Sequence, residues 1–252
     1  MAKRSPRKLH GNIAIPVAAA GDHCRNLLLA ALSPAERDRL LQTTIDTVTP
    51  ALKEMLHKPG QPIQYVYFPG GGFCSIVTVL EDGSMVEVAT VGREGMVGIN
   101  AMADGTPPIS AAMVQGGGGF CYRMTTDAFR QEMNRRGEFF EVVTRYANAL
   151  LYLIMQSTAC NAVHTVEQRL ARWLLMAQDR MEANEFHLTQ EFAAMMLGAT
   201  RPTVTVVAGT LQRAGLITYH RGLVRIVNRE KLEDASCECY RTSTVILGAV
   251  AT

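Results

Sequence analysis

The sequence lacks the long apolar run that a membrane-spanning helix requires. Its richest apolar stretch, residues 147–155, is short and amphipathic, whereas a span needs roughly 18 consecutive apolar residues. The basic start, residues 1–8, is not followed by the apolar core and cleavage site of a signal peptide. We therefore expect a flexible tail over residues 1–25, no membrane partner and a cytoplasmic location.

A strong charge of either sign is also missing. The formal net charge is +2 over 252 residues, which is not typical of a protein that coats nucleic acid along its whole surface. Any affinity for DNA must therefore come from a local surface. The 48% of apolar residues suffices to bury a sizeable core in one large domain or two ordinary ones.

Cysteines are few, and they lack the dense, even spacing of a secreted disulfide framework. They are Cys24, Cys74, Cys121, Cys160, Cys237 and Cys239. We expect reduced thiols. Only Cys237 and Cys239 are close in sequence, and no Cys-x-x-Cys or His-x-x-x-His segment accompanies them, so we expect no metal site. The glycine run 116–119 lacks the lysine and the following helix of a phosphate-binding loop.

Residues 51–124 contain short runs rich in Val, Ile, Tyr and Phe, separated by glycine and proline. The runs cover residues 63–68, 73–80, 85–91, 111–114 and 120–124. Strands at this spacing indicate an antiparallel sandwich or barrel. Residues 81–84, Glu-Asp-Gly-Ser, predict a hairpin turn, because Asp and Gly tolerate the backbone angles of a tight turn. Residues 26–47 show helical spacing, with a helix start at Ser33.

A helical period continues from about residue 127 to 180, with breaks expected near Gly137 and around residues 161–165. Inside it, seven residues follow the three-four alternation of a seam between two packed helices. They are Phe140, Val143, Ala147, Leu150, Ile154, Ser157 and Asn161. Because this helix joins a β-rich half to a helical end, we expect it to pair with a second copy of the chain. The alternative is a helix packed on its own barrel.

Residues 188–217 have the pattern of a helix-turn-helix. This motif needs a small residue where the helices cross, a glycine at the turn and apolar residues that lock the second helix. These demands are met, in order, by Ala194, Gly198, Val204 and Val207. Thr189 and Thr200 can cap the two helices, and Pro202 costs little in a first helical turn.

The start of the second helix presents side chains that suit DNA. The fork of Arg201 matches the two acceptors of a guanine, while threonine hydroxyls suit phosphates. A hairpin over residues 216–227 has the form of a wing. The residues that we expect to contact DNA are Thr189, Gln190, Thr200, Arg201, Thr203, Thr205, His220 and Arg221. The alternative is an ordinary helical hairpin with a solvated arginine.

Taken together, the β-rich half, the long helix and the winged motif ending in Leu211-Gln212-Arg213-Ala214-Gly215-Leu216-Ile217 resemble the CRP/FNR superfamily. The resemblance covers about residues 26–240. It implies an α+β protein with a cyclic-nucleotide-binding-like double-stranded β-helix, or jelly roll, over residues 26–136. It further implies a dimerisation helix over 137–163 and a winged helix-turn-helix DNA-binding domain over 164–252.

By position, Arg201 matches the family's first base-reading arginine, and four polar residues match its phosphate contacts. These four are Thr189, Gln190, Thr200 and Thr203. Two positions depart from the family pattern. Pro202 stands where many members carry a base-reading glutamate, and Val206 where they carry a second arginine. The target sequence should therefore differ from the family's familiar operator.

The β-rich domain, residues 26–136, departs further from the family pattern. A segment that resembles the start of the cyclic-AMP phosphate cassette, and that we take as the effector pocket, consists of Gly92, Arg93, Glu94 and Gly95. Residues 104–111, however, contain no arginine where the cassette requires one. A buried phosphate without a charge-assisted partner is costly, so we expect an effector other than a cyclic nucleotide.

The family's other sensor chemistries find few ligands here. Only Cys24 precedes Cys74, so an N-terminal iron–sulfur cluster is not expected. His23, His57 or His164 could in principle bind haem, but a lone histidine is more often a surface or core residue with a structural role. We therefore expect no cofactor.

The leading hypothesis is a transcription regulator that binds an inverted-repeat site as a homodimer. Its expected partners are double-stranded DNA, a second copy of the chain and RNA polymerase. One alternative is a cyclic-nucleotide-responsive regulator of the same type, and another is a signalling module whose helix-turn-helix contacts only protein. We expect no enzyme, because a metal-holding barrel needs a His/Glu cluster and residues 73–91 offer only Glu81 and Glu87.

Overall fold

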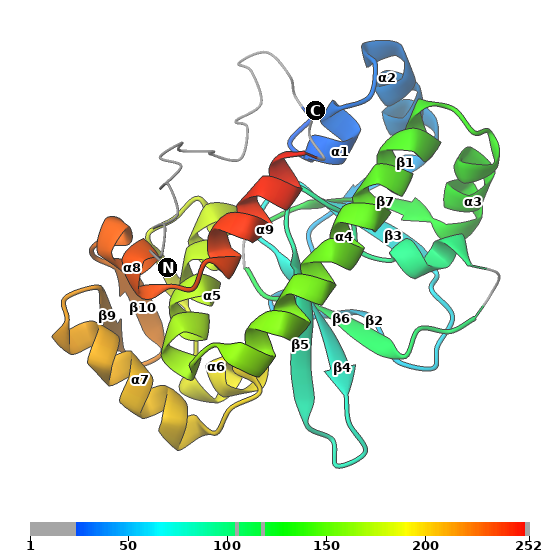
Figure 1. The fold of residues 1–252 in the computed structure, drawn as a ribbon. Helices are drawn as coiled ribbons and strands as arrows, with labels where there is room; N and C mark the ends of the chain where they lie inside the picture. The colour runs from blue at the N-terminus through cyan, green and yellow to red at the C-terminus, as the bar shows by residue number, and fades with distance from the viewer. Residues whose placement is uncertain (1–23, 104–105, 117–118, 250–252) are drawn as a thin grey trace, which may run out of the picture.

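The fold combines a β domain, a long helix and a mainly helical C-terminal domain (Figure 1). The structure is a computed structural model that describes residues 24–103, 106–116 and 119–249. Residues 1–23 of the expected tail, with His23, lie outside the described part, as do residues 104–105 of the cassette segment. Cys24 is buried, and Arg25 pairs with Glu182 at 3.1 Å, so the last two residues of the expected tail are anchored.

The β domain opens with two helices, α1 (Leu27–Ala30) and α2 (Pro34–Thr43), the second of which is capped by Ser33 as predicted. Its strands are β1 (Ile45–Val48), β2 (Met55–His57), β3 (Tyr65–Pro69), β4 (Cys74–Val79), β5 (Met85–Val91), β6 (Ser110–Val114) and β7 (Cys121–Thr125). A 3-10 turn, η1 (Ile99–Met102), lies between β5 and β6.

The strands form two antiparallel sheets with the orders β1-β7-β3 and β2-β6-β4-β5. Side chains from both sheets meet in buried clusters, as expected for a jelly roll. The expected hairpin at residues 81–84 joins β4 to β5, with Gly83 at φ +81°. The strand β1 corrects the helical expectation for residues 45–47: it pairs with the distant β7, Ile45 opposite Met124.

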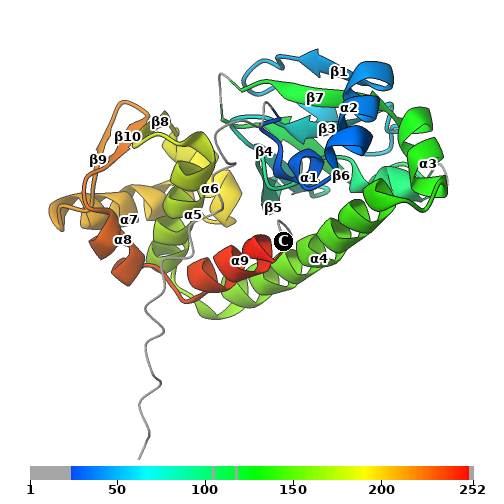
Figure 2. The same ribbon diagram turned by 90° about the horizontal axis from the view of Figure 1, so that it is seen from above.

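The helical stretch that follows divides into α3 (Thr126–Asn134), α4 (Glu138–Val163) and α5 (Val166–Met181). The breaks at Gly137 and at residues 164–165 confirm the predicted ones. The second break is stabilised by a capping box in which Thr165 and Gln168 satisfy each other's backbone amides. Figure 2 shows α4 running along the β domain toward the C-terminal domain.

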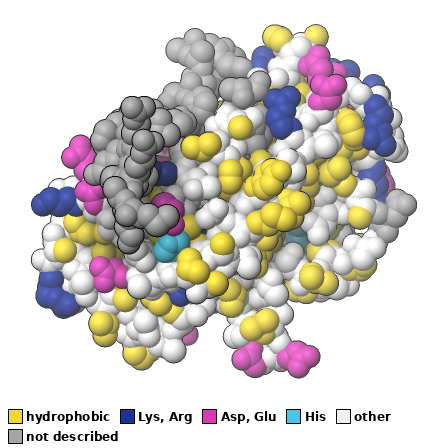
Figure 3. All heavy atoms as spheres, in the orientation of Figure 1, with side chains coloured by type: hydrophobic (Ala, Val, Ile, Leu, Met, Phe, Trp, Pro, Cys, Tyr) yellow, Lys and Arg dark blue, Asp and Glu magenta, His cyan; other side chains and the backbone are white. Residues whose placement is uncertain are grey.

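Two of the seven residues predicted for the seam on α4 are buried in their own chain, whereas Phe140, Ala147, Ile154 and Ser157 are half-buried and Asn161 is exposed. Val143 is 0% exposed and Leu150 7% exposed, and both pack into the core of their own chain, as in the alternative reading. A buried side chain cannot reach a second copy of the protein. The outward apolar stripe of α4 includes Leu151, Tyr152 and Met155, which are 49%, 52% and 55% exposed. Hydrophobic side chains accordingly gather over α4 at the centre of Figure 3.

The C-terminal domain surrounds a small sheet of order β8-β10-β9. After α5, its elements are β8 (Glu185–His187), α6 (Gln190–Leu197), α7 (Arg201–Arg213), β9 (Ile217–His220), β10 (Leu223–Ile226), α8 (Arg229–Ala235) and α9 (Cys239–Gly248). The hairpin β9–β10 confirms the predicted wing, whereas β8 was not expected. The last helix, α9, folds back beside α4 (Figure 2).

One apolar core joins the two domains. Phe73 of the β domain packs edge-on against Trp173 of α5, which in turn contacts Phe186 of β8. The two domains therefore share buried surface. Among the described residues, no helix combines the length and the apolar character needed to cross a membrane.

Candidate nucleic-acid interface

The helix-turn-helix is built from α6 and α7, joined by a tight turn. Gly198 ends α6 in the left-handed region, at φ +55°, where a glycine avoids the strain of a side chain. The hydroxyl of Thr189 accepts the Phe192 amide at 3.1 Å, and that of Thr200 accepts the Thr203 amide at 3.3 Å. Both predicted caps are thus confirmed, and the fully buried Val204 locks α7 against the core.

The residues predicted to contact DNA lie at the surface of this unit. Exposed ones are Thr189, Thr200, Arg201, Thr205, His220 and Arg221, while Gln190 and Thr203 are half-buried. Arg201 makes no ion pair with any residue that the structure describes, so its guanidinium is available. The Thr205 hydroxyl lies 2.7 Å from the Gln190 side-chain oxygen and 2.9 Å from the Arg201 carbonyl, so it links α6 to α7.

The wing is held firmly against the start of α6. At its tip, Arg221 and Gly222 have φ values of +49° and +78°, the positive pair that a tight two-residue hairpin requires. The Gly222 carbonyl accepts the Leu188 amide at 2.8 Å, and the Tyr219 hydroxyl donates to the Leu188 carbonyl at 2.6 Å. These bonds place the wing beside the helix-turn-helix.

In the β domain, the segment Gly92–Gly95 contacts two helices. Glu94 is 3% exposed and its carboxylate lies 2.6 Å from the Arg180 guanidinium of α5. A side chain on Gly92 would approach Arg180 to 2.8 Å, and one on Gly95 would approach the Tyr146 ring of α4 to about 2.6 Å. The two glycines therefore permit close helix packing.

Arg93, in the same segment, pairs with Glu182 just beyond α5 at 2.6 Å. Both charged residues of the expected effector pocket thus contact the C-terminal domain. A cavity of about 140 Å³ lies beside them and is lined in part by Arg25, Arg93 and Arg180. A larger cavity, of about 300 Å³, lies between the domains and is lined in part by Phe73 and Trp173.

Two family models match the two halves of this arrangement. Residues 51–136 match the cyclic nucleotide-binding domain, and residues 168–235 match the Crp-like helix-turn-helix domain. The chain belongs to the CRP/FNR family. It is accordingly a transcription regulator with a DNA-binding helix-turn-helix, which agrees with the resemblance seen in the sequence.

Several solved structures share the fold over most of the chain. FixK2 from Bradyrhizobium japonicum is 17% identical, with a TM-score of 0.63 over 77% of this chain and 98% of its own. The c-di-GMP-responsive global regulator CLP from Xanthomonas campestris is 15% identical (TM-score 0.64, 76% and 98%). A CRP/FNR transcriptional regulator from Thermus thermophilus is 19% identical (TM-score 0.60, 76% and 98%). No curated protein sequence matches the chain.

The structure also places the ligands considered for other CRP/FNR sensors. His57 is buried, and its Nε2 lies 2.8 Å from the Tyr65 carbonyl. This hydrogen bond gives the His57 ring a structural role. Cys24, Cys74 and Cys121 are buried in the β domain. His164, by contrast, lies among Cys160, Cys237 and Cys239, a group that sequence reasoning missed.

Sequence reasoning also missed the residues that join the two domains. Glu87 of β5 accepts a hydrogen bond from the Trp173 indole at 2.9 Å and another from Ser75. Burial raises the pKa of Glu87 to about 7, although both hydrogen bonds favour the ionised form. No short motif marks such pairs, because Glu87 and Trp173 are far apart in the sequence.

Proposed function

We propose that this CRP/FNR regulator binds an inverted-repeat DNA site as a homodimer, with α7 in the major groove of each half-site. The observation that carries the proposal is the guanidinium of Arg201 at the exposed start of α7, which forms no ion pair with any described residue. The Thr200 cap and the Gly198 turn fix the direction in which α7 begins. A rigid helix start with a free arginine suits direct reading of a base.

Base reading in this proposal depends on two positions of α7. Arg201 donates both hydrogen bonds of its fork to the O6 and N7 of a guanine. Val206 is 66% exposed more than one helical turn later, and its methyl groups suit the methyl of a thymine. Apolar contact at position 206 would replace the arginine that many relatives carry there.

Polar residues around Arg201 and Val206 are proposed to contact the DNA phosphates. The partial positive charge at the N-terminal ends of α6 and α7 attracts phosphate oxygens, and the capping residues Thr189 and Thr200 stand at these two ends. Gln190, Thr203 and Thr205 extend the same polar surface, and His220 and Arg221 add the wing. Such contacts position the protein but carry no sequence information directly.

Two copies are joined, in this proposal, through the outward stripe of α4. Parallel pairing of that helix would set the two α7 helices about one DNA turn apart, roughly 34–36 Å. A dimer of this kind reads inverted repeats, and it would present one surface to RNA polymerase beside the DNA.

The effector is proposed to be other than cyclic AMP or cyclic GMP. Glu94, which relatives would offer to a ligand, is already buried against Arg180. Isothermal titration calorimetry with cyclic AMP, cyclic GMP and c-di-GMP tests this expectation, and we expect no heat of binding from the first two at micromolar concentrations. A micromolar dissociation constant for either would favour the cyclic-nucleotide-responsive alternative.

The DNA proposal is tested by selecting sites from random DNA with the purified protein and then titrating single-base variants. Arg201→Ala should cost roughly 1–3 kcal/mol per half-site and remove the preference at one base pair. Arg201→Lys keeps the charge without the planar fork, so it should restore general affinity more than selectivity.

Arg241→Ala, an exposed arginine on α9, serves as the matched control and should leave both affinity and preference unchanged. If Arg201→Ala weakens all variants equally, Arg201 contacts a phosphate and the base is read elsewhere. Absence of any salt-dependent DNA affinity would favour the module that contacts only protein.

A further inference from the structure

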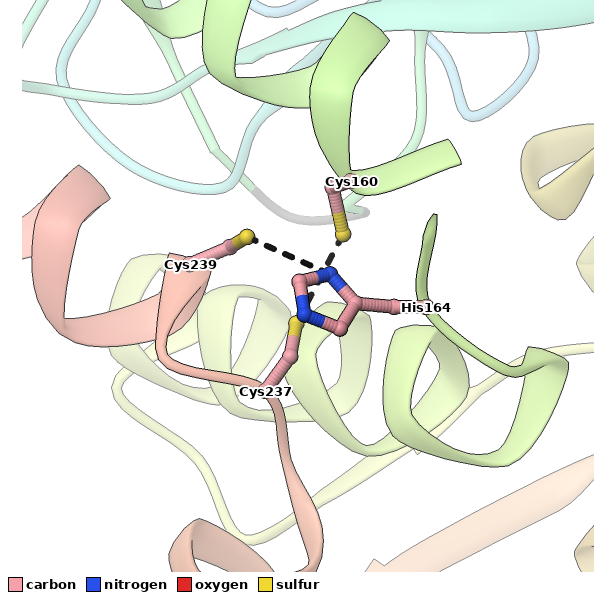
Figure 4. Close-up of side chains that lie close together, drawn as sticks. All are labelled: Cys160, His164, Cys237 and Cys239. Atoms are coloured by element: carbon pink, nitrogen blue, oxygen red, sulfur yellow. Dashed lines mark hydrogen bonds between the residues drawn. The ribbon is translucent and has the colours of Figure 1, made fainter. Parts of the chain in front are cut away.

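Four potential metal ligands meet where the C-terminal domain joins α4. The Sγ atoms of Cys160, Cys237 and Cys239 and one ring nitrogen of His164 all lie within 4.8 Å of one another (Figure 4). Cys160 and His164 come from the end of α4, whereas Cys237 and Cys239 come from the segment that begins α9. The three thiols are at most 3% exposed and form a cluster of their own.

The spacing suits one tetrahedral ion. The Sγ atoms of Cys160 and Cys237 are 3.5 Å apart, and Cys239 Sγ lies 3.5 Å from His164 Nδ1. Around zinc, with Zn–S bonds of about 2.3 Å and Zn–N bonds of about 2.0 Å, tetrahedral ligand atoms are separated by roughly 3.5–3.8 Å. A modest contraction of the widest separation would therefore complete the coordination, without movement of the helices.

Neighbouring side chains orient these ligands. Glu238 lies 3.2 Å from Nε2 of His164, whereas Cys239 Sγ lies 3.5 Å from Nδ1, so a proton held on Nε2 by Glu238 leaves the Nδ1 lone pair for a metal. A carboxylate behind a metal-binding histidine fixes its tautomer and raises its basicity. Gln156 donates its side-chain amide to Cys239 Sγ at 3.0 Å, which suits a thiolate better than a thiol.

The positive charge beside the three cysteines and His164 also favours a metal site. Three thiolates and one divalent cation carry a net charge of −1. Arg172 of α5 is 9% exposed, its Nε has no hydrogen-bond partner among the described atoms, and its charge acts on both Cys160 and Cys237. The same charge also acts on the half-buried Glu87 of β5. A buried cation of this kind would be compensated by an anionic metal centre.

We propose that Cys160, His164, Cys237 and Cys239 bind one zinc ion in a closed structural site. Three thiolates and one imidazole are a ligand set typical of structural zinc, and four protein ligands leave no open position for catalysis. The thiol protons are released to solvent as the ion binds. The ion joins the end of α4 to the start of α9, next to the two-residue connection into α5.

Metal analysis of the untagged full-length protein, purified under reducing conditions, tests the site. We expect close to one zinc per chain in the wild type, and strongly reduced zinc in Cys160→Ser, Cys237→Ser and His164→Asn. Cys121→Ser and His187→Ala are the matched controls, since both residues lie outside the cluster, and they should keep the wild-type content. Cobalt substitution should give the visible and near-ultraviolet bands of tetrahedral thiolate coordination.

A variant outside the four ligands tests the site even if the ligand variants fail to fold. Glu238 is 77% exposed at its side chain, so Glu238→Gln should fold normally and weaken zinc affinity about 10-fold to 100-fold in a chelator competition. Glu230→Gln, also exposed, should leave the affinity unchanged. Wild-type protein that binds neither zinc nor cobalt after reconstitution would overturn the proposal. So would an iron–sulfur chromophore, or a Cys160–Cys237 disulfide found under reducing conditions.

Discussion

At the scale of single residues, Glu87 is a half-buried carboxyl group at the contact between the two domains. It lies between β4, β5 and α5, where Ser75 and Trp173 donate to it, and the charges of Arg172 and Arg180 act on it from α5. Burial nevertheless raises its pKa to about 7. The group is therefore partly protonated near neutral pH.

This pKa predicts a pH-dependent stability. The folded chain keeps a proton on Glu87 that the unfolded chain, with a pKa near 4.5, has already released. The contribution to the free energy of unfolding should therefore be fully present below about pH 4.5 and be lost as the pH rises toward 7, by at most about 3 kcal/mol. Glu87→Gln should lack this loss in urea unfolding at pH 5 and pH 8, at one chain concentration.

Glu81→Gln is the matched control for this measurement, because Glu81 lies exposed on the β4–β5 hairpin. Its pH dependence should equal that of the wild type. If Glu87→Gln also follows the wild-type curve, the pKa of Glu87 is not raised in the folded state.

At the scale of elements, the proposed homodimer depends on the outward stripe of α4. Leu151→Glu or Met155→Glu should convert a dimer to a monomer, because each change removes apolar burial twice and places like charges across the seam. A loss of roughly 3 kcal/mol or more corresponds to at least a hundredfold weaker association. Analytical ultracentrifugation measures this change directly.

Val79→Glu controls for a new charge at an exposed apolar position, since Val79 is 39% exposed on the hairpin between β4 and β5. It should remain dimeric. A wild-type protein that is monomeric at micromolar concentration, yet binds DNA fully, would contradict the role of α4.

Local signals in the sequence predicted most elements. Ser33, Thr189 and Thr200 were recognised as caps because their side chains act on amides two or three residues away. The strand β1 was missed because its partner, β7, is nearly eighty residues distant. On α4, the sequence predicted the helical period but also assigned the buried residues Val143 and Leu150 to the seam. Apolar side chains occur on both the buried and the outward side of this helix, so the pattern alone does not separate the two sides.

The group around His164 could have been found only in part. Cys160 and His164 stand four residues apart, which places two potential ligands on one face of a helix end. The other pair, Cys237 and Cys239, is more than seventy residues away. Only the return of α9 to α4 brings the two pairs together.

At the scale of the whole molecule, the buried pair of Glu94 and Arg180 links the β domain to the C-terminal domain. Arg180→Met should destabilise the protein by about 3–5 kcal/mol, because it leaves a buried carboxylate without its partner. The double variant Glu94→Gln/Arg180→Met should recover most of this loss. Urea unfolding of the two single variants and the double variant measures the coupling, and additive losses would contradict it.

Trp173 is the only tryptophan of the 252-residue sequence, and it lies between Phe73 and Phe186 with its indole N–H on Glu87. All tryptophan fluorescence therefore originates at the junction of the two domains. Emission colour and intensity should report separation of the domains and protonation of Glu87, without any attached dye. The protein therefore carries an intrinsic fluorescent probe at the contact between the β domain and the domain that holds the helix-turn-helix.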